Sequence, residues 1–337
     1  MKQIKFSILD LALVCAGSTP AETLNKSLAL AQKAEEFGYS RFWLAEHHNA
    51  ISIASAATSV LIGYIAGGTK KIRVGSGGIM LPNHSPLIIA EQFGTLGALY
   101  PNRIDLGLGR APGTDQETAH AIRADRMQSV YRFPEEIAEI QQYFSTGNNT
   151  ARVRASVAEG INVPIYVLGS STDSAHLAAK MGLPYAFASH FAPAQLHEAL
   201  GIYHNEFKPS AFLQQPYTMA GVNVIVADTD EAAAGISTTF IRVIAGILSG
   251  RRELLPAPVP MNDELRELSQ HPAVQQMMKY SFVGNKATVK QKTEAFLAET
   301  KVNELIVVTN IYDAADRIQS YQTFAEIMKE VNKELGI

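Results

Sequence analysis

The sequence predicts a closed (β/α)8 barrel that forms a single domain over residues 1–337. Short apolar runs alternate with helical segments eight times along the 337 residues. The runs carry apolar residues on both faces, as strands do when helices cover both sides of a parallel sheet. A doubly wound sheet of six strands would leave two of the eight units unexplained, whereas a barrel of eight uses them all.

The first unit contains a strand at residues 4–9 and a helix that its own capping residues delimit. Thr19 is predicted to cap the helix, Pro20 suits its first position, and Glu22 completes a capping box with Thr19. Gly38 ends the helix. The next three units place strands at 41–45, 72–75 and 103–108, and helices at 55–67, 87–99 and 134–144.

The second half of the chain repeats the same order of strand and helix. Strands are predicted at 163–168, 185–188, 218–227 and 304–308, and helices at 173–181, 193–207, 230–248 and 314–335. Two irregular stretches fit no unit: residues 145–162 are polar, and residues 250–284 carry Pro256, Pro258 and Pro260 with a charged segment behind them. Insertions of this length are often functional, and the second is the better candidate for a mobile cover of the site.

Composition restricts the class of partner. The 29 basic and 32 acidic residues give a net charge of −3 without a basic block, which argues against nucleic acid as a partner. No apolar run approaches the roughly 18 residues of a membrane helix, so no membrane partner is expected. The single cysteine, Cys15, favours a reducing cytoplasm. The apolar start of the chain resembles a secretory signal, but Asp10 interrupts it, so a buried first strand is the better interpretation.

Polar residues and glycines gather where six of the predicted strands end. In a barrel of this kind the loops after the strands build the active face, so we expect a functional site there. These positions are Asp10, residues 46–49 (EHHN), 75–78 (GSGG), 107–110 (GLGR), 169–171 (GSS), Ser189 and His190.

The EHHN segment carries the most reactive side chains. Because strand residues alternate in direction, Glu46 and His48 should share one side while His47 takes the other. Adjacent histidines that diverge are poor joint metal ligands, so no metal is predicted. Two alternatives stay open for the histidines: one serves as a general base or substrate donor, or they are simply packed and solvated.

Two further strand ends suggest an anionic ligand. The segment GLGRAPG (107–113) does not match the dinucleotide-binding spacing of glycines, but Arg110 would place a fixed cation at the barrel mouth. The segment GSSTDSA (169–175) precedes a helix and predicts either simple N-capping or, as we favour, phosphate binding at the helix N-terminus. The GSGG segment leaves room for a flat ligand, or only permits a bulge.

Four longer strings resemble the bacterial luciferase-like flavin-dependent monooxygenases. The strings are FWLAEHHN (42–49), VGSGGIMLPNHSPLIIAEQFGTL (74–96), PNRIDLGLGRAPGTD (101–115) and IYVLGSSTDSAHLAAKMGLPYAFASHF (165–191). The resemblance implies a TIM barrel that binds FMN without a covalent bond. It also implies that reduced FMN comes from a separate flavin reductase and reacts with O2 to oxidise a small organic substrate.

The resemblance also assigns residues. His47 corresponds to the active-site histidine of the family, with Glu46 beside it at the flavin site and Arg110 near the flavin phosphate; these three form the expected catalytic group. Cofactor contacts are expected from Gly77 and Gly78, which correspond to a pair joined by a cis peptide bond, from Arg110, and from Ser170, Ser171 and Ser174 of the phosphate-binding turn.

Some positions depart from the family pattern or stay open. Gly109 stands where some light-emitting members have a reactive cysteine, so light emission is not expected. A further phosphate-contacting arginine could be Arg123, Arg126 or Arg132. Substrate contacts are suggested for Asp10, His48 and His190 from their strand-end positions. The family often forms homodimers, which we also expect here. The alternatives are an oxidoreductase that uses the deazaflavin F420 and a flavin-binding protein without turnover.

Overall fold

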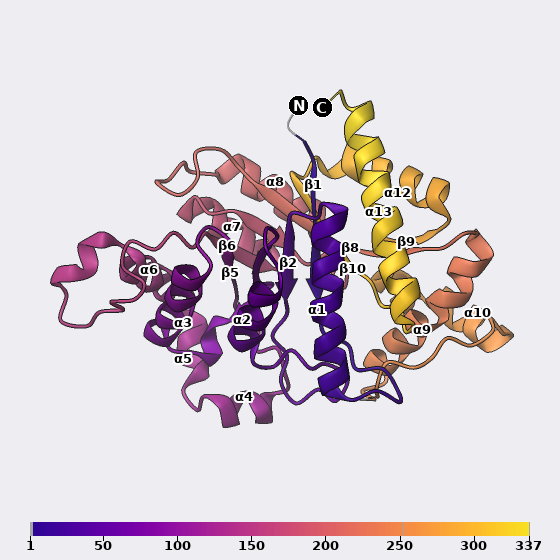
Figure 1. Ribbon diagram of the computed structural model, residues 1–337, viewed down its shortest axis with the longest axis horizontal. Helices are drawn as coiled ribbons and strands as arrows, with labels where there is room; N and C mark the ends of the chain where they lie inside the picture. Colours follow the sequence, from indigo (N-terminus) through magenta and orange to yellow (C-terminus); the bar gives the residue numbers. More distant parts are fainter. Residues whose placement is uncertain (1–2, 252, 337) are drawn as a thin grey trace.

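Eight parallel strands form the closed barrel that the sequence predicts. The computed structural model describes residues 3–251 and 253–336, apart from the side chains of residues 126 and 127. The strands pair in the order β10-β1-β2-β3-β5-β6-β7-β8, and β8 pairs back with β10 to close the sheet (Figure 1). The barrel strands are β1 (Lys5–Asp10), β2 (Arg41–Leu44), β3 (Arg73–Ser76), β5 (Ile104–Gly109), β6 (Ile165–Gly169), β7 (Tyr185–Phe187), β8 (Thr218–Val226) and β10 (Glu304–Val308).

Helices surround the barrel, and the predicted units are confirmed one by one. The helices that follow the eight strands in the predicted units are α1 (Pro20–Phe37), α2 (Thr58–Gly68), α3 (Pro86–Leu99), α6 (Phe133–Phe144), α7 (Thr172–Met181), α8 (Leu196–Glu206), α9 (Asp230–Leu248) and α13 (Ala314–Glu334). The predicted capping box is present, since Thr19 accepts from the Glu22 amide while the Glu22 side chain accepts from the Thr19 amide. Gly38 ends α1 in a left-handed conformation.

Further elements lie between the predicted units. The structure adds strands β4 (Ile79–Met80) and β9 (Ser281–Gly284), the 3-10 helices η1 (Leu81–Asn83) and η2 (Thr146–Thr150), and the helices α4 (Gln116–Ile122), α5 (Arg126–Tyr131), α10 (Asp263–Gln270), α11 (Pro272–Met277) and α12 (Lys286–Thr300). The predicted irregular stretch 250–284 thus contains α10, α11 and β9, and β9 pairs with the far half of β8. Helix α12 was not predicted from the sequence.

The stretch after α9 is held in place rather than hanging free of the barrel. Leu255 pairs with the loop after β1, donating its amide to the Val14 carbonyl at 2.9 Å and accepting from the Ala16 amide at 2.8 Å. Thr238 and Arg242 of α9 donate to the carbonyls of Val259 and Ala257. The stretch therefore runs along α9, to which it is hydrogen-bonded, and reaches the loop after β1 at the rim of the barrel mouth.

The amino end of the barrel is closed by a buried charge network. The Arg41 guanidinium lies 2.7 Å from Asp105 and 3.0 Å from Glu304. The Trp43 indole donates to Asp105 at 3.1 Å, and the Tyr217 hydroxyl donates to Glu304 at 2.5 Å. Apolar side chains from β1, β2, β6, β7, β8 and β10, among them Leu9, Trp43 and Met219, fill the barrel above it. The interior is therefore a packed core, and only the carboxyl end is available for a ligand.

One helix changes the expectation about apolar runs. Within the residues that the structure describes, α9 is long and apolar enough to cross a membrane by length and composition. The expectation that no run approaches this length was wrong, because the alanines, isoleucines and threonines of α9 do not form one visibly apolar block. In the structure α9 packs against β8, β9 and the helices α10 and α11.

Candidate functional site

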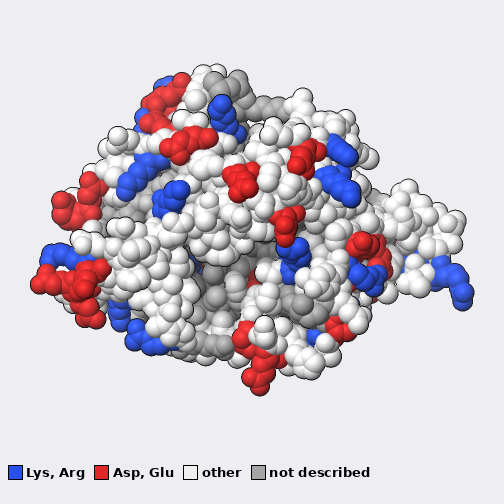
Figure 2. All heavy atoms as spheres, turned by 180° about the vertical axis from the view of Figure 1, so that it is seen from behind, with Lys and Arg blue, Asp and Glu red and all other residues white. Residues whose placement is uncertain are grey.

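The candidate site lies at the carboxyl ends of the barrel strands. Figure 1 shows β1 running from the chain ends at the top of the view, while α4, which follows β5, lies at the opposite end of the barrel. Seen from behind, the surface is hollowed low in the molecule, at this same end (Figure 2). The loops after β2, β3, β5, β6 and β7 bring the predicted residues there.

Glu46 is the centre of a hydrogen-bond cluster. Its buried carboxylate, 1% exposed, accepts from His48 Nε2 at 2.8 Å and from His84 Nε2 at 2.9 Å. The Met80 amide donates at 2.9 Å and the Asn83 side-chain amide at 3.2 Å. The arrangement uses donors from the loops after two neighbouring strands, so Glu46 ties those loops together.

This cluster fixes the charge of Glu46. Burial alone would raise the pKa of the carboxyl, but the hydrogen bonds from His48 and His84, the charge of His84 and the Met80 amide outweigh it and lower the pKa to about 2. Glu46 is therefore an anion at neutral pH. It can orient the two imidazoles but cannot act as a proton donor.

His48 lies on the same side of the segment as Glu46, as the strand alternation predicts, and His47 stands between them in the sequence. His47 is not among the donors to Glu46, whereas His48 is. Burial lowers the pKa of His47, a tendency that the Gly113 backbone and the charge of Glu46 oppose. A neutral imidazole in a half-buried position can accept a proton, which is the property of a general base.

The GRAPGTD loop holds this segment in place. The His48 amide donates to the Gly113 carbonyl at 3.1 Å, and the Thr114 hydroxyl donates back to the His48 carbonyl at 3.0 Å. Gly113 has a positive φ of 66°, and a Cβ there would lie 2.7 Å from the Glu46 carbonyl oxygen. The glycine is therefore required for the close approach of the two loops.

The peptide bond between Gly77 and Gly78 is cis, as the resemblance implied. A Cβ on Gly77 would meet the Leu9 and Trp43 side chains, and a Cβ on Gly78 would lie 2.8 Å from the Gly107 carbonyl oxygen. The packing of the barrel thus requires glycine at both positions. A contact with a flat ring from these glycines stays a prediction.

Arg110 and the N-terminus of α7 meet at the mouth. The Arg110 guanidinium lies 3.1 Å from the Asp173 carboxylate in the first turn of α7. The N-cap residue is Ser171, and its side chain makes no capping hydrogen bond. The simple capping alternative by Ser171 is therefore not realised, and amide groups of the first turn stay available to an anion.

The other two serines of this turn differ from each other. Ser170 is exposed. The Ser174 hydroxyl donates to the Ser171 carbonyl at 2.7 Å and lies 3.0 Å from the Tyr185 hydroxyl. Ser174 therefore shapes the turn, while Ser170 is placed at the surface where a ligand could reach it.

The three arginines that are candidates for a phosphate contact differ in their surroundings. Arg123 donates to the His84 carbonyl at 2.6 Å and to the Ser129 hydroxyl at 3.0 Å, so it braces the loop that carries His84. Arg132 is exposed at the start of α6. The side chain of Arg126 lies outside the described part of the structure.

The structure places Asp10 away from the mouth. Its carboxylate accepts from the Ser27 hydroxyl of α1 at 2.6 Å and from Arg317 of α13 at 2.8 Å, and it is fully buried. Asp10 therefore joins the barrel to two helices, and we do not retain it as a substrate contact. Its strand-end position misled because the side chain faces the helix layer.

His190 sits across the mouth, after β7. Burial lowers the pKa of His190, and the charge that the nearby His47 would carry lowers it further. The Asn223 side chain donates to the His190 carbonyl at 2.6 Å, and Asn310 donates to Asn223 at 3.4 Å. This side of the mouth thus carries uncharged polar groups.

Sequence reasoning missed His84 and Asn83. Both lie in LPNHSP, to which no individual functional role was assigned, and both donate to Glu46. No periodic pattern marks them, because η1 is too short to show one. The signal available was the LPNHSP string itself, which carries part of the resemblance. Among the described residues no group of three or more metal-ligating side chains is suitable for a metal.

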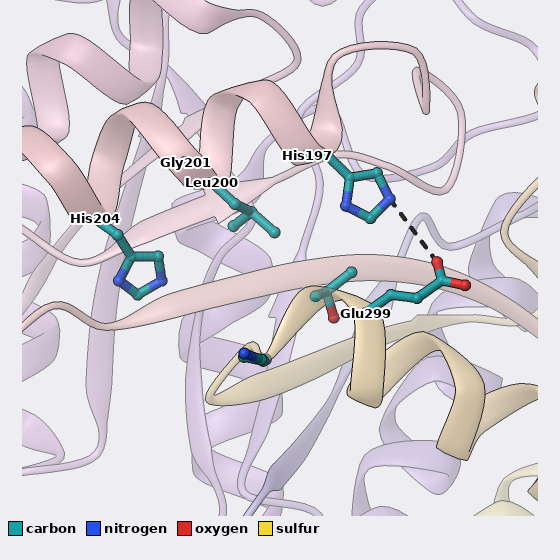
Figure 3. Close-up of a pocket in the computed structure, with 7 residues that line it drawn as sticks. His197, Leu200, Gly201, His204 and Glu299 are labelled. Atoms are coloured by element: carbon teal, nitrogen blue, oxygen red, sulfur yellow. Dashed lines mark ion pairs between the residues drawn. The ribbon is translucent and has the colours of Figure 1, made fainter.

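A groove of about 300 Å³ lies elsewhere, between α8 and α12 (Figure 3). His197 points toward Glu299 across it, with 3.9 Å between the charged atoms, and Leu200 and His204 line its wall. The groove belongs to the outer helices, and none of the predicted site residues lines it.

Comparisons with known proteins agree with this fold. Residues 4–324 match the family model of the luciferase-like monooxygenases. The chain is 46% identical to a luciferase-like monooxygenase of Escherichia coli (strain K12) over 98% of both chains. It is 34% identical to the N-acetyl-S-alkylcysteine monooxygenase of Bacillus subtilis over 96% of this chain and 98% of that one. The solved structure of apo-MsnO8 superposes with a TM-score of 0.88 at 35% identity, covering 97% and 99% of the chains.

More distant solved structures share the fold alone. The oxygenating constituent of 3,6-diketocamphane monooxygenase from Pseudomonas putida, in complex with FMN, has a TM-score of 0.71 at 18% identity, covering 96% and 97% of the chains. The coenzyme F420-dependent tetrahydromethanopterin reductase from Methanopyrus kandleri has a TM-score of 0.67 at 18% identity, covering 98% and 99%. Both kinds of flavin cofactor therefore occur on this fold.

Proposed function

Because the chain belongs to the luciferase-like monooxygenase family, we propose that it is an FMN-dependent monooxygenase that oxidises a small organic substrate. Reduced FMN would be delivered by a separate flavin reductase, and O2 would be the second substrate. The observation that carries the proposal is the meeting of Arg110 with the uncapped N-terminus of α7, at the same end of the barrel strands as the Glu46 cluster.

The donor set at α7 fits a phosphate. A guanidinium, the first-turn amides and the exposed Ser170 would all donate, and a helix N-terminus adds its positive dipole end. Arg110, Ser170 and Ser171 would hold the phosphate of FMN, while Ser174 keeps the turn in shape. Gly77 and Gly78 would lie beside the ring. When bound, the reduced flavin supplies the electrons that activate O2.

The chain's own residues would hold the active-site groups in position and accept a proton. His47 would accept a proton at the reacting centre, since its imidazole is neutral and half-buried. Glu46 acts through others: its anion orients His48 and His84 and holds two loops together. Glu46 is therefore proposed as a positioning residue, rather than as a member of the catalytic group in which the resemblance placed it beside His47.

Two alternative functions predict different experimental results. An F420-dependent oxidoreductase would bind F420 in preference to FMN and would not consume O2 with substrate. A flavin-binding protein without turnover would bind FMN, yet neither substrate nor the change His47→Ala would alter oxygen consumption. Oxygen consumption with reduced FMN, across a panel of aldehydes, ketones and thioethers, separates the three.

The expected homodimer has a suitable face on α2 and α3. Val60 and Leu99 are 69% and 65% exposed, and Tyr64 and Ile88 also reach the surface. Glu91 is the only charged residue of the two helices. A two-fold interface sets a surface against itself, so a face almost without charge avoids like-charge repulsion. We propose that a second copy of the chain covers it.

A cytoplasmic location is part of the proposal. It is supported by the single cysteine and by the need for a partner reductase that draws on cellular reductant.

A further inference from the structure

The His190 ring packs against the backbone of the neighbouring strand, β8. The ring lies over Gly221 of β8, where a Cβ would collide with His190 Nδ1. The Ser189 hydroxyl donates to the Gly221 carbonyl at 2.7 Å, and the Asn223 amide donates to the His190 carbonyl at 2.6 Å. The Phe191 ring meets the imidazole edge-on at 4.9 Å between centroids. The ring therefore has a fixed position.

The surroundings of the His190 ring favour one of its two neutral tautomers. Nδ1 is buried and has no hydrogen-bond partner within the described residues. A proton on Nδ1 would be a buried donor without an acceptor, which costs more than leaving the proton on Nε2, where a ligand or water can accept it. The residue as a whole remains partly exposed, so the edge that carries Nε2 can face the mouth.

The surroundings keep the ring neutral. Burial and the neighbouring His47 lower the pKa of His190 to about 4. Among the described residues, His47 is the titratable group whose charge acts on it, and the hydrogen-bonding side chains around it, Ser189 and Asn223, are uncharged. At neutral pH the ring is therefore an uncharged donor.

We propose that His190 determines substrate specificity: its Nε2–H donates a hydrogen bond to an uncharged carbonyl oxygen of the substrate, across the mouth from His47. The inference rests on the proposed function, because it places an organic substrate in this mouth. The substrate class is a ketone, aldehyde or amide with an apolar body. A carboxylate is disfavoured, since the neutral ring offers it no countercharge.

The tautomer can be measured without any substrate. Long-range ¹H–¹⁵N NMR of the histidine rings, with His190→Gln as the assignment variant, should show a neutral Nε2–H ring from pH 5 to 8. A proton on Nδ1, or a charged ring at pH 7, would overturn the proposal.

The preference for carbonyl is tested with 2-hexanone, hexanoate and hexane as probes of similar size. The wild-type chain should bind 2-hexanone about 3- to 10-fold more tightly than hexane or hexanoate, as one hydrogen bond provides. The advantage should vanish in His190→Phe, persist in part in His190→Gln, and be lost in Gly221→Ala, where the ring is displaced. An unchanged preference in His190→Phe contradicts the inference.

Flavin binding by the same variants separates the two proposals. His190→Phe should bind FMN as the wild type does, which also shows that the variant folds. If no chain binds flavin while 2-hexanone is still preferred, the proposed function fails and the carbonyl preference stands.

Discussion

Glu46 and His84 lie 38 residues apart in the chain, yet His84 Nε2 donates to the Glu46 carboxylate at 2.9 Å. His48 donates to the same oxygen at 2.8 Å. One buried anion therefore connects the loops that follow β2 and β3, and the site depends on it for its shape.

The change Glu46→Gln should destabilise the chain at neutral pH. The folded-state pKa of about 2 lies below the usual 4.5, so ionisation of Glu46 contributes about 3 kcal/mol of stability above pH 4.5. This contribution is lost as the pH falls from 4.5 through 2. Urea unfolding at several pH values should show a gap between wild type and variant that narrows below pH 4.5. A gap independent of pH would contradict this, and the exposed Glu117→Gln should show none.

The change His47→Ala should lower substrate-dependent oxygen consumption by roughly 10²- to 10⁴-fold, as loss of a general base does. Binding of FMN should change little. His197→Ala, in the groove between α8 and α12, is the matched control and should retain the wild-type rate. Equal rates for His47→Ala and wild type would favour the protein without turnover.

The change Arg110→Ala should weaken FMN binding by about 10-fold, since a charge-assisted contact to the phosphate is lost. Riboflavin has no phosphate, so its affinity should be the same in wild type and variant. Arg154→Ala, which removes an arginine paired with Glu159 in the 145–162 stretch, should bind both flavins normally. An equal loss for both flavins would show that Arg110 does not contact phosphate.

The changes Val60→Glu and Leu99→Glu should each convert the proposed homodimer to a monomer, because each would bury a charge against its own copy at a two-fold interface. Light scattering after size exclusion gives the mass. Phe212→Glu alters a residue that is equally exposed, at 62%, and should remain dimeric. A monomeric wild type would refute the proposed face.

Barrel strands could be predicted because each is buried on both faces and bounded by polar loops. Even the capping of α1 follows from Thr19, Pro20 and Glu22. The direction of the side chains at the strand ends could be predicted for some residues but not for others. Alternation placed Glu46 with His48 correctly, but Asp10 faces the helices, where Arg317 comes from the other end of the chain.

The features that could not be predicted depend on contacts between residues that lie far apart in the sequence. His84 could not be linked to Glu46 from spacing, since the contact exists only once β2 and β3 are neighbours. β9 could not be foreseen either, because it extends beyond the barrel and pairs only with the far half of β8. Local patterns therefore predict the strands, whereas the hydrogen-bond clusters depend on the closed sheet.

The most direct test is a flavin titration of the purified chain, first with oxidised FMN, then with anaerobically reduced FMN, and with F420 in parallel. We predict tighter binding of reduced FMN than of oxidised FMN, and weaker binding of F420. Failure to bind either form of FMN at millimolar concentration, with F420 bound, would contradict an FMN-dependent monooxygenase.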